Sequence, residues 1–259
     1  MTKLDILFLG TCAANFSPRL KTDLADRFDK DARRSSSVLI DGKYLVDCGI
    51  HTADCLRLAK VDVTRITDVF ITHTHYDHFM PEVVERVADL AGHPLCLWIN
   101  ENANIPEIDG VTVRRMPLFE EQAVSEDFTV SSIRANHDPK AAPVHYVFNK
   151  NGKKMLYACD GAWLLTDSYN YLKNASLDVA VLDATCGDYA GDWRMAEHNS
   201  IPMIRLMLPS MKNFGIINES TVIYLSHLAP SLHKSHAETA DLVRNDRLLV
   251  AYDGLHVQI

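Results

Sequence analysis

The chain has 259 residues, of which 47% are hydrophobic and 23% are charged, and this composition is sufficient for a substantial buried core. The formal net charge of -8, from 34 acidic and 26 basic residues, disfavours a long polyanion such as RNA as the partner. No run of about twenty apolar residues occurs, so the sequence predicts no membrane span. The six cysteines form no CxxC pair, and Asp5 interrupts the apolar N-terminus. Both features favour free thiols, no signal peptide and a cytoplasmic location.

Strand and helix patterns alternate along the chain. In chain order, we expect strands at residues 4–10, 37–40, 44–46, 68–72, 95–99, 111–116, 128–133, 144–148, 155–158, 179–182, 222–225 and 248–252. Helical patterns cover residues 51–60, 81–90, 198–212 and 235–243, and part of the polar segment 21–31. Asp41-Gly42 and Asn151-Gly152 are typical of turns that join neighbouring strands into hairpins.

No repeat or Pro/Gly-rich linker divides the sequence, so we predict a single domain over residues 1–259. Hairpins mixed with crossover helices imply sheets covered by helices on one face, and two such halves give an α/β (α+β) sandwich with αββα layers. The polar segment 16–34 fits a lid, a dimer contact or a loose loop equally well. Arg33 and Arg34, at its end, could contact phosphate, but a solvated charge pair is the simpler interpretation.

A cluster of metal-binding residue types, His73-Thr74-His75-Tyr76-Asp77-His78, directly follows the apolar strand 68–72. His73 and His75 project to the same side of an extended chain, so they can hold one ion. Asp77 and His78 lie where the chain turns and can face a second ion. The alternative is a chance histidine-rich tract, which the HxHxDH spacing directly after a strand argues against.

This motif resembles the signature of the metallo-β-lactamase superfamily, and the resemblance extends along nearly the whole chain. Four further residues match superfamily positions in the expected order: Asp47, His137, Asp160 and His227. The resemblance implies the αββα fold and two divalent metal ions. One ion would take His73, His75 and His137, the other would take Asp77, His78 and His227, and Asp160 would bridge them. Asp47 would orient the motif loop by accepting hydrogen bonds.

Within the superfamily, the chain resembles the cyclic phosphodiesterases of phosphonate breakdown and, more loosely, tRNase Z. The likeness rests on Leu9-Gly10-Thr11, Arg33 to Ser37, Asn136-His137, Asp183 to Cys186, Glu197-His198-Asn199 and Ala251 to Val257. Flavo-diiron proteins carry a glutamate where His75 stands, and true β-lactamases lack the bridging aspartate, so both are disfavoured. Persulfide dioxygenases have a related motif, so the ligand set alone does not exclude that class of enzyme. The phosphonate enzyme holds a structural zinc in a cysteine cluster after its first strand. Only Cys12 stands there in this chain, so no third metal is predicted.

The resemblance implies a metal-dependent hydrolase, in which a hydroxide between the two ions attacks a small or cyclic phosphodiester. Zinc is the expected metal, with manganese or iron as alternatives. Asp77 and His198 are the expected catalytic residues, with His198 as the general acid for the leaving oxygen and Asp183 orienting it. A lactone or thioester hydrolase with the same seven ligands is the alternative, and a non-enzymatic metal protein is a third. We expect a small-molecule substrate, neither long nucleic acid nor a membrane as partner, and, from related enzymes, a homodimer.

Overall fold

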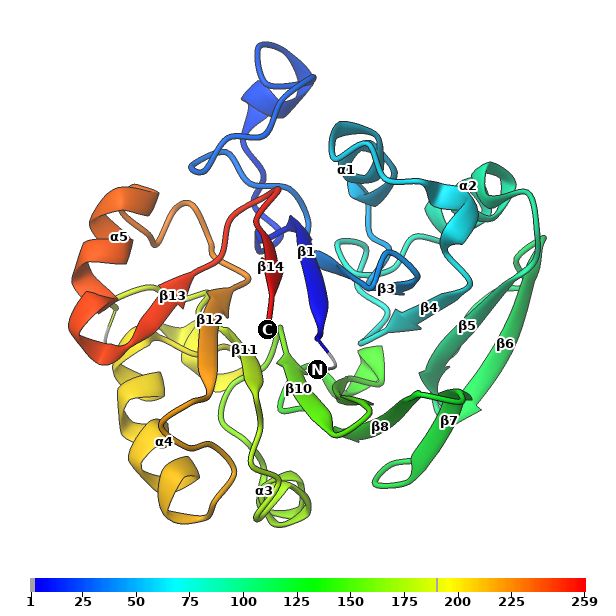
Figure 1. Cartoon of the computed structure of the whole chain (residues 1–259). Coiled ribbons are helices and arrows are strands. Elements are labelled where there is room, and N and C mark those ends of the chain that lie inside the picture. The colour runs from blue at the N-terminus through cyan, green and yellow to red at the C-terminus, as the bar shows by residue number, and fades with distance from the viewer. Residues whose placement is uncertain (1–2, 190) are drawn as a thin grey trace.

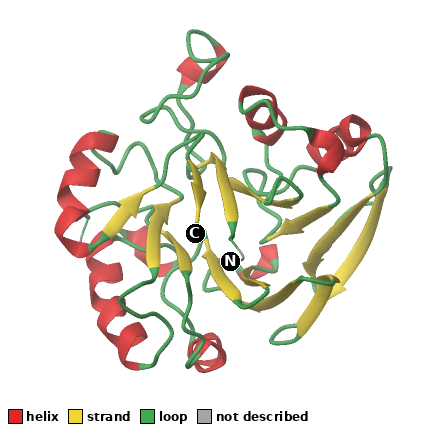
Figure 2. Cartoon of the chain, viewed as in Figure 1, coloured by secondary structure: helices red, strands yellow, loops and turns green. Residues whose placement is uncertain are grey.

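The structure is a computed structural model that describes residues 3–189 and 191–259. Within this part of the chain, two β-sheets pack face to face and carry helices on their outer faces (Figures 1 and 2). The strands of the first sheet are β1 (Asp5–Gly10), β2 (Ser37–Ile40), β3 (Tyr44–Val46), β4 (Asp68–Ile71), β5 (Leu95–Asn100), β6 (Val111–Met116) and β14 (His256–Gln258). The strands of the second are β7 (Glu121–Ser125), β8 (Phe128–Arg134), β9 (Val144–Lys150), β10 (Lys153–Ala158), β11 (Val179–Asp183), β12 (Val222–Ser226) and β13 (Leu248–Val250).

The order of the strands brings the carboxyl ends of many of them to one edge of the molecule. The first sheet runs β14-β1-β2-β3-β4-β5-β6 and the second runs β13-β12-β11-β10-β9-β8-β7. Strands β3 to β6 are parallel, as are β10 to β13. Parallel strands end at the same edge of a sheet, where ligands commonly bind in α/β proteins. The loops after β3, β4, β10, β11 and β12 can therefore meet between the two sheets.

Three apolar layers hold the sandwich together. The central layer lies between the sheets and includes Phe8, Phe70, Tyr146 and Phe148, all fully buried. Helices α1 (Thr52–Leu58) and α2 (Pro81–Ala91) cover the first sheet, and α3 (Thr166–Leu172), α4 (Ile201–Asn213) and α5 (His236–Val243) cover the second. The predicted αββα sandwich is thereby confirmed. None of the helices in the described ranges has the length and apolar character needed to cross a bilayer.

The structure differs from the predicted elements in a few places. Residues 21–31 form turns after a short 3-10 helix (Pro18–Lys21) rather than a helix of their own. The helix expected over 198–212 begins at Ile201, because Ser200 is its N-cap, and His198 therefore lies in the preceding loop. Strands β7 and β14 and helix α3 were not predicted. β7 and β14 are edge strands with largely exposed or half-buried residues, so they lack the apolar runs of the inner strands.

The interpretation of Arg33 and Arg34 as a solvated charge pair was wrong, because both side chains are buried. The Arg34 guanidinium donates to the Leu24 and Arg27 carbonyls, at 2.6 and 3.2 Å. Arg33 donates to the Ala251 carbonyl at 2.6 Å. Segment 16–34, which projects from the sandwich in Figure 1, is thus held by arginine hydrogen bonds to carbonyls, which hydrophobic periodicity does not reveal.

Candidate metal centre

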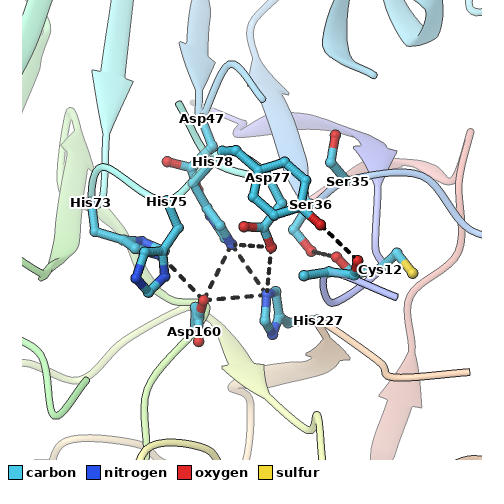
Figure 3. Close-up of polar contacts among 12 residues, drawn as sticks. Cys12, Ser35, Ser36, Asp47, His73, His75, Asp77, His78, Asp160 and His227 are labelled. Carbon is cyan, nitrogen blue, oxygen red and sulfur yellow. Dashed lines mark hydrogen bonds and ion pairs between the residues drawn. The ribbon is translucent and has the colours of Figure 1, made fainter. Parts of the chain in front are cut away.

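Every residue of the predicted centre lies in a loop that follows a strand. The motif loop His73 to His78 follows β4, His137 follows β8, Asp160 follows β10 and His227 follows β12. The structure brings all seven predicted ligands together at the edge between the sheets. Figure 3 labels these ligands except His137. Six of the seven side chains are buried, and His75 is partly exposed. Four of the predicted ligands thus come from a loop of the first sheet, and three come from loops of the second.

Three polar residues adopt left-handed backbone conformations where their strands end. Asp47, Asp160 and His227 have φ values of 62°, 63° and 56°. This region is uncommon for residues other than glycine and costs about 1 kcal/mol or more per residue. The left-handed turn bends the chain sharply after β3, β10 and β12, and the polar side chain is left at the inner edge of the sandwich. Such strain clusters at functional sites because the surrounding structure enforces it.

The first group of donors consists of three histidines and one carboxylate oxygen. His75 Nδ1 lies 3.1 Å from both His73 Nε2 and His137 Nε2. His73 Nε2 lies 3.2 Å from Asp160 Oδ2. Four donors placed tetrahedrally about 2.0–2.1 Å from a zinc ion are about 3.3–3.4 Å apart, so these separations fit one ion.

The second group shares the same carboxylate oxygen. His78 Nε2 and His227 Nε2 are 3.1 Å apart, and each lies 3.4 Å from Asp160 Oδ2. Asp77 Oδ2 lies 3.5 Å from His78 Nε2 and 3.6 Å from His227 Nε2. Figure 3 shows Asp160 between the His73–His75 pair and the group of Asp77, His78 and His227. The same oxygen, Asp160 Oδ2, therefore lies close to nitrogen donors of both groups.

For three of the buried histidines, His73, His78 and His227, the second ring nitrogen has a hydrogen-bond partner, whereas Nδ1 of His137 has none in the described residues. His78 Nδ1 lies 2.8 Å from Asp47 Oδ2, His73 Nδ1 lies 3.0 Å from Thr72 Oγ1, and His227 Nδ1 lies 2.7 Å from Thr185 Oγ1. A proton on each Nδ1 leaves Nε2 with a lone pair directed at the donor group, as in metal-binding histidines. Burial lowers the pKa of His73 to about 3, so this imidazole stays neutral. At His78 and His227 the neighbouring carboxylates outweigh burial and raise the pKa, to about 9 for His227, so metal binding there would displace a proton.

The charge balance of the centre also fits divalent cations. Burial raises the pKa of Asp160, but His227, His198, His73 and His78 outweigh it and hold the pKa well below the usual range. Within the described ranges, no lysine or arginine forms an ion pair with Asp77 or Asp160. Buried carboxylates are normally paired or bound to metal. The donor types, their spacing and their charge all fit two divalent ions.

Asp47 contacts both the motif loop and Thr72, the residue that precedes it. Its Oδ1 accepts from the Thr72 backbone N–H at 2.8 Å and from the Thr72 hydroxyl at 2.9 Å, and its Oδ2 faces His78 Nδ1. The loop also packs tightly on the backbone beyond Asp47. A Cβ atom on Gly49 would lie 1.9 Å from the Asp77 carbonyl oxygen, so only glycine fits there.

We predict that Asp47→Asn weakens metal binding about 10- to 100-fold, because the single amide oxygen cannot accept from both Thr72 and His78 Nδ1, and the amide NH2 would face one of these donors. Asparagine tolerates the left-handed backbone, so the fold is retained. Competition with a coloured chelator measures the change. Asp41→Asn is the matched control, because Asp41 also has a left-handed backbone (φ 55°) but lies in a hairpin turn away from the centre. Equal metal affinity of Asp47→Asn and the wild type would show that Asp47 only shapes the turn.

Asp183, at the end of β11, connects the centre to His198. Its carboxylate accepts from the backbone N–H groups of Thr185 and Asn199 at 2.9 Å each. It lies 3.2 Å from His198 Nδ1 and 3.3 Å from His227 Nδ1. The predicted contact between Asp183 and His198 is therefore present. The contacts of Asp183 with His227 and Thr185 were not predicted, although Asp183 follows an apolar strand just as Asp47 and Asp160 do.

A cavity of about 370 Å³ opens over the donor groups. Its lining includes residues of the candidate centre, His75, Asp77, His137, Asp160, His198 and His227. The rest of the lining is Ala13, Ala14 and Asn15, which directly precede segment 16–34, with Thr185, Arg194, Glu197 and Ala229. Sequence analysis missed Arg194, because a single arginine in a loop gives no pattern. The cavity is within the size range of small-molecule sites.

Comparison with known proteins places this arrangement in a family. Residues 43–238 match the model described as the beta-lactamase superfamily domain. The chain belongs to this superfamily. The resemblance predicted from the sequence is confirmed, and the fold of the superfamily implies divalent metal ions. The expected class, a metal-dependent hydrolase, agrees with the family.

Individual relatives match more distantly. Zinc phosphodiesterase ELAC protein 1 of Mus musculus and that of Homo sapiens are each 38% identical over 79 residues, 29% of this chain. The match spans only 18% of the length of these curated relatives.

Among solved structures, the metallo-beta-lactamase fold protein YhfI from Bacillus subtilis is similar over 100% of both chains, with a TM-score of 0.76 and 13% identity. A diphosphatase from the PhnP family covers 100% of this chain and 98% of its own, with a TM-score of 0.72 and 16% identity. Human tRNase Z, short form, covers 98% of both chains, with a TM-score of 0.66 and 20% identity. At these identities the solved structures support the fold alone.

Proposed function

We propose that the protein is a two-metal phosphodiesterase that acts on a small or cyclic phosphodiester. The observation that carries this proposal is the shared position of Asp160 Oδ2, at 3.2–3.4 Å from donors of both groups. A carboxylate shared in this way sets two cations side by side. Paired cations suit an in-line displacement at phosphorus, because one can stabilise the attacking oxygen and the other the leaving oxygen. Zinc is the metal we favour, since histidine and carboxylate donors in tetrahedral sets suit it.

The charge of the inner site suits an anionic substrate. Two divalent ions would supply four positive charges and Lewis-acid activation of the phosphoryl group and the attacking water. Asp77 and Asp160 supply two negative charges, so the centre keeps a positive excess that a singly charged diester can share. The whole chain has a formal charge of -8, which favours a small diester over a long polyanion. The names of the relatives, a zinc phosphodiesterase, a diphosphatase and a tRNase Z, support phosphate chemistry.

His198 is positioned to act as the general acid for the leaving oxygen. Asp183 and Asp160 face its Nδ1 at 3.2 and 2.9 Å. These contacts fix the ring at the wall of the cavity, where His198 is among the lining residues. A proton held on such a ring can pass to a leaving alkoxide, a contribution of typically about 10²- to 10⁴-fold in rate. Asp183 orients His198 and does not itself contact substrate.

Hydrolysis of bis-p-nitrophenyl phosphate by protein loaded with zinc or manganese tests the proposal. A lactone and a thioester are assayed beside it, with Asp160→Ala as the control protein. We expect metal-dependent release of p-nitrophenolate by the wild type only. Hydrolysis of the lactone or thioester, without hydrolysis of any diester, would contradict the proposal and assign the same two-metal site to carboxyl-ester chemistry.

A further inference from the structure

Arg194 is the one lysine or arginine among the described residues that line the cavity over the donor groups. It lies in a 3-10 turn (Trp193–Ala196) between β11 and α4, outside the motifs that supply the donors. No ion pair joins it to Asp77, Asp160 or Asp183 within the described ranges. Its ionic partner is Asp192 instead, which is not among the residues that line the cavity.

Asp192 fixes the guanidinium of Arg194 in one orientation. Asp192 Oδ1 accepts from Arg194 Nε at 2.8 Å, and Oδ2 accepts from Nη2 at 2.9 Å. The same Oδ1 also accepts from the Arg194 backbone N–H at 2.9 Å, as the N-cap of the turn. Side chain and backbone of Arg194 are thus held by one carboxylate, and little rotational freedom would be lost when a ligand binds.

The pairing with Asp192 uses only one edge of the guanidinium. Two of its five N–H groups point to Asp192, and no partner of Nη1 is found in the part of the chain that the structure describes. The edge formed by Nη1 and Nη2 matches the spacing of two oxygens of a phosphate. The side chain is 30% exposed and lines the cavity.

We propose that Arg194 binds a second phosphate of the substrate, so that the enzyme prefers phosphodiesters carrying an additional anionic group beside the scissile one. This rests on the proposed function of the site. The scissile group would lie at the shared carboxylate Asp160, while Arg194 recognises a neighbour within the same cavity of about 370 Å³. Asp192 is a positioning residue in this account.

Two esters that differ by one phosphate test the proposal. The p-nitrophenyl ester of thymidine 5′-monophosphate is compared with the same ester carrying a 3′-phosphate, so that the scissile bond is identical. We expect the wild type to prefer the second ester about 10- to 100-fold in kcat/KM, as for hydrogen bonds between charged groups. Arg194→Met should lose this preference, and Arg194→Lys and Asp192→Asn should reduce it. Arg205→Met is the matched control, because Arg205 forms a similar pair with Asp246, at 3.0 and 2.7 Å, on α4.

Calorimetry gives a second readout that does not depend on turnover. Thymidine 3′,5′-bisphosphate should bind the metal-loaded wild type and Arg205→Met at least about tenfold more tightly than thymidine 5′-monophosphate, and Arg194→Met should bind both equally. Equal binding of the two nucleotides by the wild type, or an equal loss for both in Arg194→Met, would overturn the role of Arg194. Hydrolysis of neither ester would overturn the proposed phosphodiesterase, and the calorimetry would still decide the role of Arg194.

Discussion

Replacing Asp160 with alanine is expected to abolish phosphodiester hydrolysis and to remove at least one of the two metal ions. Asp160 Oδ2 is the one atom common to the two donor groups, within 3.2–3.4 Å of His73, His78 and His227. Each group would keep three donors, and two cations would face each other without the carboxylate between them. A metal ion lowers the pKa of its bound water from about 15.7 to about 7, so loss of the ion lowers the ionised fraction at neutral pH by about eight orders of magnitude. Metal analysis after dialysis and hydrolysis of bis-p-nitrophenyl phosphate measure the two effects.

The control for Asp160→Ala is Asp167→Ala, which removes a surface carboxylate paired with Arg134 at 2.9 Å. This change should affect neither metal content nor turnover, because exposed ion pairs contribute little. Full metal content with undiminished turnover in Asp160→Ala would show that the shared carboxylate is not a bridge.

Replacing His198 with alanine is expected to lower turnover about 10²- to 10⁴-fold while leaving the metal content unchanged. His198 contacts Asp160 and Asp183 through Nδ1 but belongs to neither of the two donor groups that share Asp160 Oδ2. The loss should depend on the leaving group. An alkoxide needs a proton as it departs, whereas p-nitrophenolate does not, so the variant should be impaired far more on a dinucleotide than on bis-p-nitrophenyl phosphate.

The comparison of leaving groups separates a general acid from a structural histidine. His93→Ala serves as the control, because His93 is partly exposed and its ring nitrogens face only the backbone carbonyls of Pro94 and Thr64. Loss of metal from His198→Ala would indicate that His198 is itself a ligand, which its place beside Asp160, Asp183 and His227 makes a specific alternative. The same loss of rate on both substrates would rule out proton donation to the leaving oxygen.

The residues of the candidate metal centre could be picked out from the sequence because they follow strands that are themselves easy to recognise. Val69, Phe70 and Ile71 are fully buried, and an apolar run of this kind fixes where a strand ends and which loop carries the histidines. The order of the remaining donors then followed from the resemblance to the superfamily. Individual distances, and the sharing of Asp160 Oδ2, depend on how two sheets pack and could not be read from local pattern.

Other features were missed because their stabilising contacts are polar and distant in sequence. The buried Arg34 donates hydrogen bonds to carbonyls of segment 16–34. Composition does not reveal these contacts, and it therefore predicted a solvated side chain. The loop position of His198 depends on Ser200, which caps α4 and starts the helix later than the apolar pattern indicates. Arg194 acquires its place at the cavity through Asp192, a local contact whose direction becomes visible only in three dimensions.

The central claim is that one carboxylate sets two metal ions side by side. Metal analysis combined with electron paramagnetic resonance of manganese-loaded protein tests it most directly. The account predicts two ions per chain with the signal of a magnetically coupled pair, and loss of that coupling in Asp160→Ala. A single ion per chain, or two ions that give only the signal of isolated manganese, would contradict it.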